Sequence, residues 1–260
     1  MNKTMGRRML AVALACAFAG MACGSAAAAT PPDARFAVLS LVGDKVSIVI
    51  RQDSVGSSLD RNSRQDIAIK GQALDRSAIQ AIDAAMARRG VPEPVLLLSR
   101  DEGLYAAQEK LFESVGDAAE AVQALKELLA QSKATHLLLL TKHRADAGFE
   151  TLNGRVGRGK IAGLGFYVDN EQGFHNDATG RDIEGYFAPF AYVKLRLIDA
   201  RSLKVLAEAA ELESRVVSTA SSATSQQAWS TMSTAEKLSE LDAMLQRAAT
   251  RAVEQVLNTR

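Results

Sequence analysis

One polar segment, residues 169–184, gathers the side-chain types that most often carry out chemistry in proteins. It holds five acidic residues and one histidine between glycines, and the candidate catalytic residues within it are His175, Asp177, Asp182 and Glu184. Carboxylates beside an imidazole can bind a metal ion or serve as general acid and base. The acids do not follow the order of a calcium-binding loop. A solvated surface loop has the same composition, so the segment predicts either a site or an exposed polar loop.

Other familiar signatures are absent or incomplete. Residues 154–160 fit G-x-x-x-x-G-K, the start of a phosphate-binding loop. Ile161 then stands where the motif needs Ser or Thr, and a strand-like alternation stands where it needs a helix. His136 and His143 are seven residues apart, so on one strand they would face opposite sides. H-E-x-x-H, G-x-S-x-G and S-x-x-K do not occur. We therefore predict no cofactor and assign no metal ligand.

The amino terminus has the order of parts of a bacterial export signal. A basic start is followed by an apolar run, residues 9–23, that is too short for a membrane span. Alanines at 26–29 offer several A-x-A frames for a signal peptidase. We predict that residues 1–29 are a cleaved signal peptide and that residues 30–260 form one periplasmic domain without a transmembrane segment.

Cleavage would change both the cysteine content and the charge. Cys16 and Cys23 are the only cysteines, so the mature chain would have no thiol for a disulfide, a metal or a nucleophile. The full chain has 31 basic and 30 acidic residues, and the signal removes three basic ones, leaving 28 against 30. This balance predicts no nucleic-acid partner recognised through bulk charge. The alternative is an outer-membrane lipoprotein anchored at Cys23, although Gly20-Met21-Ala22 fits the lipoprotein motif poorly.

Strands and helices are expected to alternate in the first half of the mature chain. Two apolar runs around Gly43-Asp44 predict a hairpin of strands 36–42 and 45–50, and residues 51–66 read as a polar loop. Apolar residues at helical spacing and short continuous apolar runs predict four further elements: helix 73–89, buried strand 95–98, helix 117–131 with a capping-box-like start at Asp117 and Glu120, and buried strand 135–141.

The second half is expected to be richer in strands. Residues 154–168 alternate between apolar residues and a face left bare by Gly163 and Gly165, which lets another backbone come close. After the polar stretch 169–185, the remaining predicted elements are strand 192–198, a turn at 199–202, strand or helix 203–217, and helix 234–257 with a capping box at Ser233 and Glu236. We therefore predict an α/β fold, with α+β as the alternative: a mixed β-sheet flanked by helices in a single compact domain that closes with a carboxy-terminal helix.

The order of these elements resembles the α/β domains of bacterial envelope proteins. The segment from Val193 through Ile198, Asp199 and Ala200 to Leu206 carries most of the likeness, and the TolB amino-terminal domain, CsgG and LpoB are the similar cases. The chain also resembles a secreted proteobacterial family without an assigned activity. The resemblance implies an envelope α/β domain and carries no site residue across. The poor lipoprotein motif departs from what such lipoproteins carry.

Two functions are consistent with these observations. The first is a non-catalytic accessory protein of the cell envelope that binds another envelope protein, with an exposed aromatic or apolar patch and no cleft in which polar groups converge. The second is a periplasmic hydrolase or metal-dependent enzyme that uses residues 169–184. The missing catalytic motifs favour the first, and the oligomeric state stays open.

Overall fold

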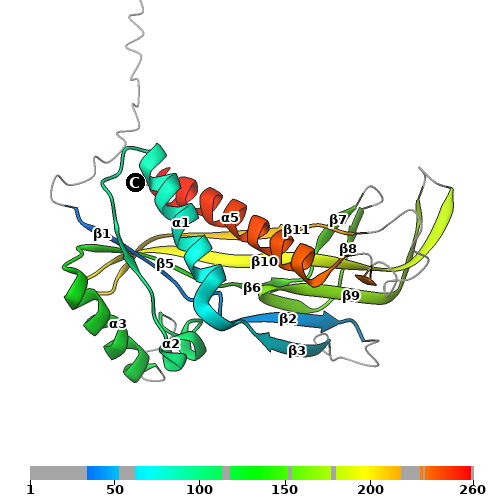
Figure 1. Cartoon of the computed structure of the whole chain (residues 1–260), viewed down its shortest axis with the longest axis horizontal. Helices are drawn as coiled ribbons and strands as arrows, with labels where there is room; N and C mark the ends of the chain where they lie inside the picture. Colours follow the sequence, from blue (N-terminus) through cyan, green and yellow to red (C-terminus); the bar gives the residue numbers. More distant parts are fainter. Residues whose placement is uncertain are drawn as a thin grey trace, which may run out of the picture.

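The computed structural model describes residues 34–52, 62–112, 118–151, 154–176, 180–217, 229–230 and 232–258 (Figure 1). The strands are β1 (Phe36–Ser40), β2 (Lys45–Ile50), β3 (Ser63–Ala68), β4 (Val95–Leu97), β5 (His136–Lys142), β6 (Arg144–Asp146), β7 (Phe149–Thr151), β8 (Gly154–Val156), β9 (Lys160–Asn176), β10 (Arg181–Asp199) and β11 (Val205–Ser214). The helices are the short 3-10 turn η1 (Lys70–Gln72), α1 (Ala73–Arg88), α2 (Glu102–Ala107), α3 (Ala119–Ser132) and α5 (Thr234–Asn258).

The long strand β10 is the spine of one mixed sheet. Along one side it pairs first with β9 and then with β5, while β11 pairs with its other side. Beyond β5 lie β1 and β4, all three parallel, and beyond β9 lie β2, which is parallel to β9, and β3. The sheet therefore divides into two halves that share β10. The division between these halves positions the cleft described below.

Helices cover the sheet on both faces (Figure 1). On one face α1 and α5 lie side by side over a continuous core that reaches from Phe36 in β1 to Phe187 in β10. On the other face α2 and α3 cover the half built from β1, β4 and β5. The hairpin of β7 and β8 covers the far half there, where Phe149 packs on Tyr167 and Tyr186. The predicted α/β class, with a mixed sheet, flanking helices and a closing helix, is confirmed.

Helix α5 begins at a side-chain cap. In α5 the Ser233 N–H donates to Glu236 Oε2 at 2.7 Å and the Glu236 N–H donates to Ser233 Oγ at 3.2 Å, which is the predicted capping box. Trp229 precedes this helix and packs edge-on against Phe166 and Phe187. Helix α3 follows Ala118, which makes no side-chain cap bond, and the capping box predicted at Asp117 and Glu120 is not tested. Asp117 lies outside the described residues.

The predicted hairpin of residues 36–50 is wrong. β1 and β2 run in the same direction and lie in different halves of the sheet, so Gly43-Asp44 joins two strands without reversing the chain. A Cβ on Gly43 would lie 2.7 Å from the backbone nitrogen of Asp75, so this glycine is needed for a close approach to α1. The loop predicted over 51–66 also ends earlier, because β3 begins at Ser63 and pairs with β2.

Two other expectations need correction, and one helix was not predicted. The described residues between 169 and 185 do not form a loop, since β9 runs on to Asn176 and β10 begins at Arg181. The strand predicted over residues 95–98 is present as β4, Val95–Leu97, but it is an edge strand whose Val95 and Leu96 are exposed and not buried. Helix α2 is missing from the sequence-based prediction, although the Asp101 carboxylate caps it by accepting from the Leu104 N–H at 3.1 Å. The strand predicted within residues 203–217 is confirmed as β11, Val205–Ser214, and the helical alternative is wrong.

The glycine-bare face of β9 has the role that the sequence indicates. A Cβ on Gly165 would lie 2.1 Å from the carbonyl oxygen of Ser47, so the adjoining strand β2 approaches as closely as it does only because the side chain is absent. Next to it Leu164 and Phe166 enter the core beneath α5. The strand also confirms that no helix follows the residues 154–160 motif, so the helix amides of a phosphate-binding loop are not formed there.

Candidate functional site

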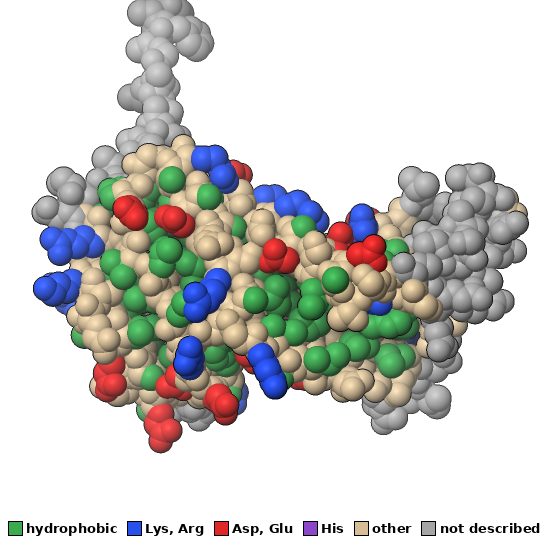
Figure 2. All heavy atoms as spheres, in the orientation of Figure 1, with side chains coloured by type: hydrophobic (Ala, Val, Ile, Leu, Met, Phe, Trp, Pro, Cys, Tyr) green, Lys and Arg blue, Asp and Glu red, His purple; other side chains and the backbone are tan. Residues whose placement is uncertain are grey.

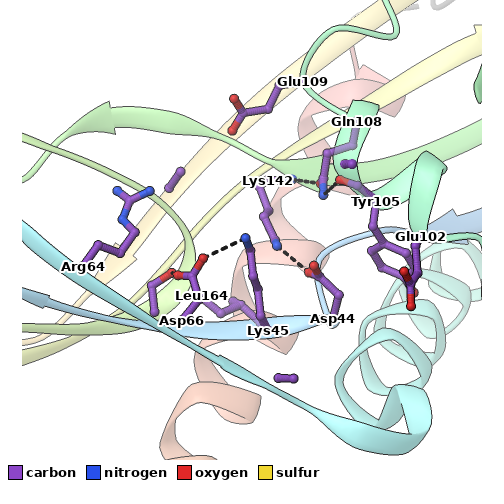
Figure 3. A pocket seen from close by; sticks show the side chains of 14 residues that line it. Asp44, Lys45, Arg64, Asp66, Glu102, Tyr105, Gln108, Glu109, Lys142 and Leu164 are labelled. Atoms are coloured by element: carbon purple, nitrogen blue, oxygen red, sulfur yellow. Dashed lines mark hydrogen bonds and ion pairs between the residues drawn. The ribbon is translucent and has the colours of Figure 1, made fainter. Parts of the chain in front are cut away.

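A cleft of about 580 Å³ opens where the two halves of the sheet separate, between the β2–β3 pair and α2 (Figure 3). Strands supply its floor and one wall, and α2 with the turn after it supplies the other wall. Its lining residues are Asp44, Lys45, Ser47, Arg64, Asp66, Ala68, Glu102, Tyr105, Ala106, Gln108, Glu109, Lys142, Ala162 and Leu164.

The strand wall carries a paired lysine and aspartate. Lys45 Nζ lies 2.7 Å from Asp66 Oδ2, and the Ser47 hydroxyl donates to Asp66 Oδ1 at 2.6 Å. Partial burial disfavours the carboxylate, but the bonds from Lys45 and Ser47 outweigh this effect and hold the pKa of Asp66 below its usual value. Asp66 is therefore an ionised acceptor at neutral pH. The Ser47 hydroxyl is engaged as a donor to it.

A second ion pair connects the two halves of the sheet. Lys142, the last residue of β5, bonds through Nζ to Asp44 in the link between β1 and β2 (Figure 3). Its backbone N–H donates to Gln108 Oε1 at 2.8 Å, which attaches the turn after α2. Gly163 faces the lysine stem, where a Cβ would lie 2.8 Å from Lys142 Cδ. The Lys142 side chain is thus enclosed on several sides, and its ammonium group is held in a fixed position.

Beneath the cleft, Asp75 of α1 is a buried carboxylate that holds the ends of three elements together. It accepts hydrogen bonds from the Ser40 hydroxyl at 2.6 Å, from the N–H groups of Val42 and Gly43 at 3.0 Å each, and from the Tyr105 hydroxyl at 2.7 Å. Burial raises the pKa of Asp75 despite these donors. Burial also raises the pKa of Tyr105, and its bond to Asp75 adds to that rise. Tyr105 is thereby fixed in the wall of the cleft.

Three charged groups of the cleft are not held in ion pairs between the described residues. Arg64 extends from β3, where its guanidinium makes a long bond of 3.4 Å to the Lys160 carbonyl oxygen. Glu102 and Glu109 extend from the opposite wall, and both are exposed (Figure 3). The cleft therefore presents a cation on its strand wall and two carboxylates on its helical wall.

Four charged groups of the cleft, Lys45 with Asp66 and Lys142 with Asp44, are held in ion pairs. None of the described lining residues is a histidine or cysteine, and the Ser47 hydroxyl donates to a carboxylate whose pKa is low. A general acid or base works best with a pKa near the working pH. Asp66 lies below that range, and the pKa of Tyr105 is raised above an already high value. Fixed charges in a cleft can instead select a partner of complementary charge.

The candidate residues of segment 169–184 lie in a hairpin at the far end of β9 and β10. The register places Asp182 directly opposite His175, and Glu184 opposite Gly173. Asp177 lies outside the described residues. The backbone thus brings two of the four candidates, His175 and Asp182, to one position of the ladder, and this hairpin is separate from the cleft. Whether these residues form a site stays a prediction.

The other histidines and the aromatic residues have structural surroundings. The Nδ1 atom of His136 is hydrogen-bonded to Thr135 Oγ1 at 2.9 Å, and the imidazole ring packs on Phe36. The pKa of His143 is lowered by partial burial and by Lys194 and Arg196. Of the expected exposed aromatic or apolar patch, the aromatic form is not found among the described side chains between Phe166 and Tyr192, which are buried. Among the residues that the structure describes, no helix is long and apolar enough to cross a membrane.

The cleft has no local signal in the sequence. The expectation that polar groups converge in no cleft is wrong, because charged side chains line this one. Its residues come from separated segments: Asp44 reads as a turn residue, Arg64 and Asp66 read as a loop, and Lys142 ends an apolar strand. Only the sheet division brings them together. The single usable hint is Asp101, a helix-capping residue type before an apolar-spaced segment, which marks α2.

Comparisons with known proteins give only distant likenesses. No protein-family model and no curated protein matches the sequence. Similar solved structures include a protein of family DUF330 from Xanthomonas campestris, with a TM-score of 0.38 and 11% identity over 86% of this chain and 84% of the other. A PelC dodecamer from Paraburkholderia phytofirmans has a TM-score of 0.30 and 12% identity over 87% and 90%. Lipoprotein GNA1162 from Neisseria meningitidis has a TM-score of 0.27 and 9% identity over 83% and 98%. At these TM-scores the likenesses carry no inference about activity.

Proposed function

We propose that this chain is an exported protein of the cell envelope that acts without catalysis, by binding another envelope protein in the cleft beside α2. The observation that carries the proposal is the pairing of the cleft's charges, Lys45 with Asp66 and Lys142 with Asp44. Groups held in such pairs present a constant charge pattern and are poorly placed to exchange protons with a substrate. The signal-like residues 1–29 support a periplasmic location.

The unpaired charges define what the partner must present. Glu102 and Glu109 on the helical wall favour a cation, and Arg64 on the strand wall favours a carboxylate. A polypeptide segment that carries both charges in the matching order fits this pattern. On the face shown in Figure 2, acidic and basic side chains are scattered without a large patch of one sign, so recognition would depend on the cleft and not on bulk charge.

Photo-cross-linking in the bacterium that encodes the chain tests this proposal. A photoreactive residue replaces Ala106, which is exposed and lines the cleft, and in a matched control it replaces Ala87, which is exposed on α1. The proposal predicts one discrete protein adduct from position 106 and none from position 87. Identification of the partner allows the reverse experiment from its side. No adduct at position 106, or equal adducts at both positions, would reject the cleft as the binding site.

A periplasmic hydrolase or metal-dependent enzyme remains the second candidate, and the opposition of His175 and Asp182 in the hairpin register favours it. Such an enzyme would depend on His175 for its metal or for proton transfer. The test compares the wild-type protein and the His175→Ala variant for bound metal and for hydrolysis of ester, phosphoester and glycoside substrates. Unchanged metal content and unchanged rates would remove this candidate.

A further inference from the structure

Among the described strands of the main sheet that pair on one side only, β11 is the longest. It runs over Val205–Ser214 and pairs with β10, and no other described strand pairs with it. Two other outer strands are shorter. β3 has six residues and carries the charged Arg64 and Asp66, and β4 has three residues. An unpaired strand edge is a template for another strand unless charge, brevity or a cover protects it.

The backbone of β11 directs every second residue outward. The Arg215 N–H donates to the Pro189 carbonyl oxygen at 3.2 Å, while Ser214 lies opposite Phe190. In an antiparallel ladder the bonded residues alternate, so odd-numbered residues of β11 bond to β10. The even-numbered residues from Glu208 to Ser214 therefore turn their N–H and C=O groups to the open edge, and at Leu206 the ladder with β10 is irregular because its register shifts between Leu197 and Ile198.

The side chains along this edge are apolar where exposure is greatest. Leu206 is 46% exposed and Leu212 is 44% exposed, and both lie on the face of the sheet opposite α5. Glu208 and Ala210 lie between them on the same face and are also exposed. Two large aliphatic side chains at one uncovered edge lose apolar exposure if another strand adds there.

The glutamates of β11 do not repel an added strand as unpaired carboxylates would, because they are held in ion pairs. Glu208 bonds to Lys194 at 3.3 Å and to Arg196 at 3.2 Å, both from the neighbouring strand. Glu213 bonds to Arg247 at 2.8 Å, and Glu211 bonds to an arginine of α5 at 2.8 Å. Each carboxylate is thus neutralised within its own chain. The approach of a strand that also carries glutamates meets little repulsion.

The sequence of β11 is nearly self-complementary about one residue. In an antiparallel pair of identical strands, the twofold axis passes between a residue and its own copy. With that axis at Ala209, Leu206 of each copy lies opposite Leu212 of the other. The glutamates then face only small or apolar partners: Glu208 faces Ala210, Glu211 faces Ala207, and Glu213 faces Val205.

Other axes are less favourable. An axis at Glu208 or Glu211 places that glutamate directly opposite its own copy, and an axis at Ala210 places Glu208 opposite Leu212. Only the axis at Ala209 pairs both exposed leucines with each other. We propose that a second copy of this chain pairs with β11 in this register, so that two sheets join into one continuous sheet across a twofold axis.

The oligomeric state of the exported protein tests this interface through matched single variants. Leu212→Lys places a charge at the edge, and Ile67→Lys places one on β3 at the opposite side of the sheet, where Ile67 is also 44% exposed. Light scattering across the micromolar range is expected to give a dimer for the wild type and for Ile67→Lys. Leu212→Lys is expected to raise the dimer dissociation constant about tenfold or more, because its charge would be buried at the interface. A monomeric wild type, or equal effects of the two lysines, overturns the proposal.

Cysteine pairs test the register itself. Leu206→Cys with Leu212→Cys places thiols opposite each other across the axis, and Leu206→Cys with Ala210→Cys is the control that fits an axis at Glu208. Within one chain these positions are about 13–20 Å apart along the strand, too far for an internal disulfide. The first pair is expected to give a disulfide-linked dimer and the control is not. Cross-linking by the control pair alone overturns the register.

A proline variant tests edge pairing while its folding is checked separately. Ala210→Pro removes an N–H that points to the open edge, so the ladder with β10 stays intact while edge pairing is blocked. Circular dichroism should show wild-type secondary structure, and light scattering should show a monomer. A folded Ala210→Pro protein that remains dimeric overturns the proposal, whatever the outcome of cross-linking from the cleft.

Discussion

Replacing Asp75 separates the effect of its hydrogen bonds from the effect of its charge. Asp75 is fully buried and accepts four hydrogen bonds, two of them from the N–H groups of Val42 and Gly43. Asp75→Ala leaves these two backbone donors buried without an acceptor. At about 1–3 kcal/mol for each, the free energy of unfolding should fall by about 2–6 kcal/mol. The hydroxyls of Ser40 and Tyr105 can turn to other acceptors, so they add less.

Asp75→Asn should behave differently. The amide oxygen can still accept from Ser40, Val42 and Gly43, and the amide nitrogen can donate to the Tyr105 hydroxyl oxygen, which is able to accept. The variant therefore keeps the bonds and loses the buried charge. At neutral pH its free energy of unfolding should lie within about 1 kcal/mol of the wild type, or above it.

The pH dependence of the free energy of unfolding shows whether the charge on Asp75 stabilises or destabilises the folded protein. Burial raises the pKa of Asp75 above its ordinary value of 3.8 in the folded state. The unfolded protein then releases its proton first, so ionisation of Asp75 destabilises the wild type as pH rises through the window between 3.8 and the raised pKa. The stability of Asp75→Asn relative to the wild type should grow across this window.

Urea unfolding followed by circular dichroism at several pH values measures all three quantities. The reasoning is refuted if Asp75→Ala loses less than about 1 kcal/mol, since two buried N–H groups would then find other partners. It is also refuted if the relative stability of Asp75→Asn falls as pH rises above 3.8, because that sign requires a lowered pKa.

Three further results are expected. Asp169→Ala should lower the free energy of unfolding by about 3–5 kcal/mol in urea titrations, because it leaves Arg51, paired with it at 2.9 Å, largely buried without its carboxylate; a loss below 1 kcal/mol would contradict a stabilising role for the pair. Gly165→Ala should prevent β2 from pairing with β9, since its Cβ would lie 2.1 Å from the Ser47 carbonyl oxygen, and a wild-type melting temperature would disprove this close approach. The pKa of Glu213 is lowered because two arginines of α5 outweigh its partial burial. Its stabilisation is therefore present above 4.5 and lost as pH falls. Glu213→Gln should cost no more than about 1 kcal/mol at neutral pH and less in acid, since the arginines are nearly half-exposed; an equal cost at both pH values would argue against the ion pair.

The parts of the fold that could be predicted are those with a strong local pattern. The helical spacing of Ile79, Ile82 and Met86 and the capping box at Ser233 locate α1 and α5 well, because such signals depend on neighbouring residues. The hairpin error at Gly43-Asp44 has a different origin. That glycine is required by contact with Asp75, a residue of α1, and a contact with a distant element leaves no pattern in the local sequence.

The candidate site depended still more on distant contacts. Lys142 and Asp44 are separated by 98 positions and become neighbours only because β1 and β5 are parallel and adjacent. The composition of residues 169–184 instead predicted a site there, because acids and a histidine lie close together in the chain. The structure replaces the expected loop with paired strands, since a backbone ladder can hold strands together without an apolar alternation.

The most direct test of the proposed function is whether reversing one cleft charge abolishes the contact with the partner. The photoreactive residue at position 106 is combined with Arg64→Glu, which reverses the cation of the strand wall at a residue that belongs to neither ion pair of the cleft. We predict that the adduct formed from position 106 disappears while the amount of exported protein stays unchanged. An adduct of undiminished yield in the Arg64→Glu protein would contradict recognition through the charges of the cleft.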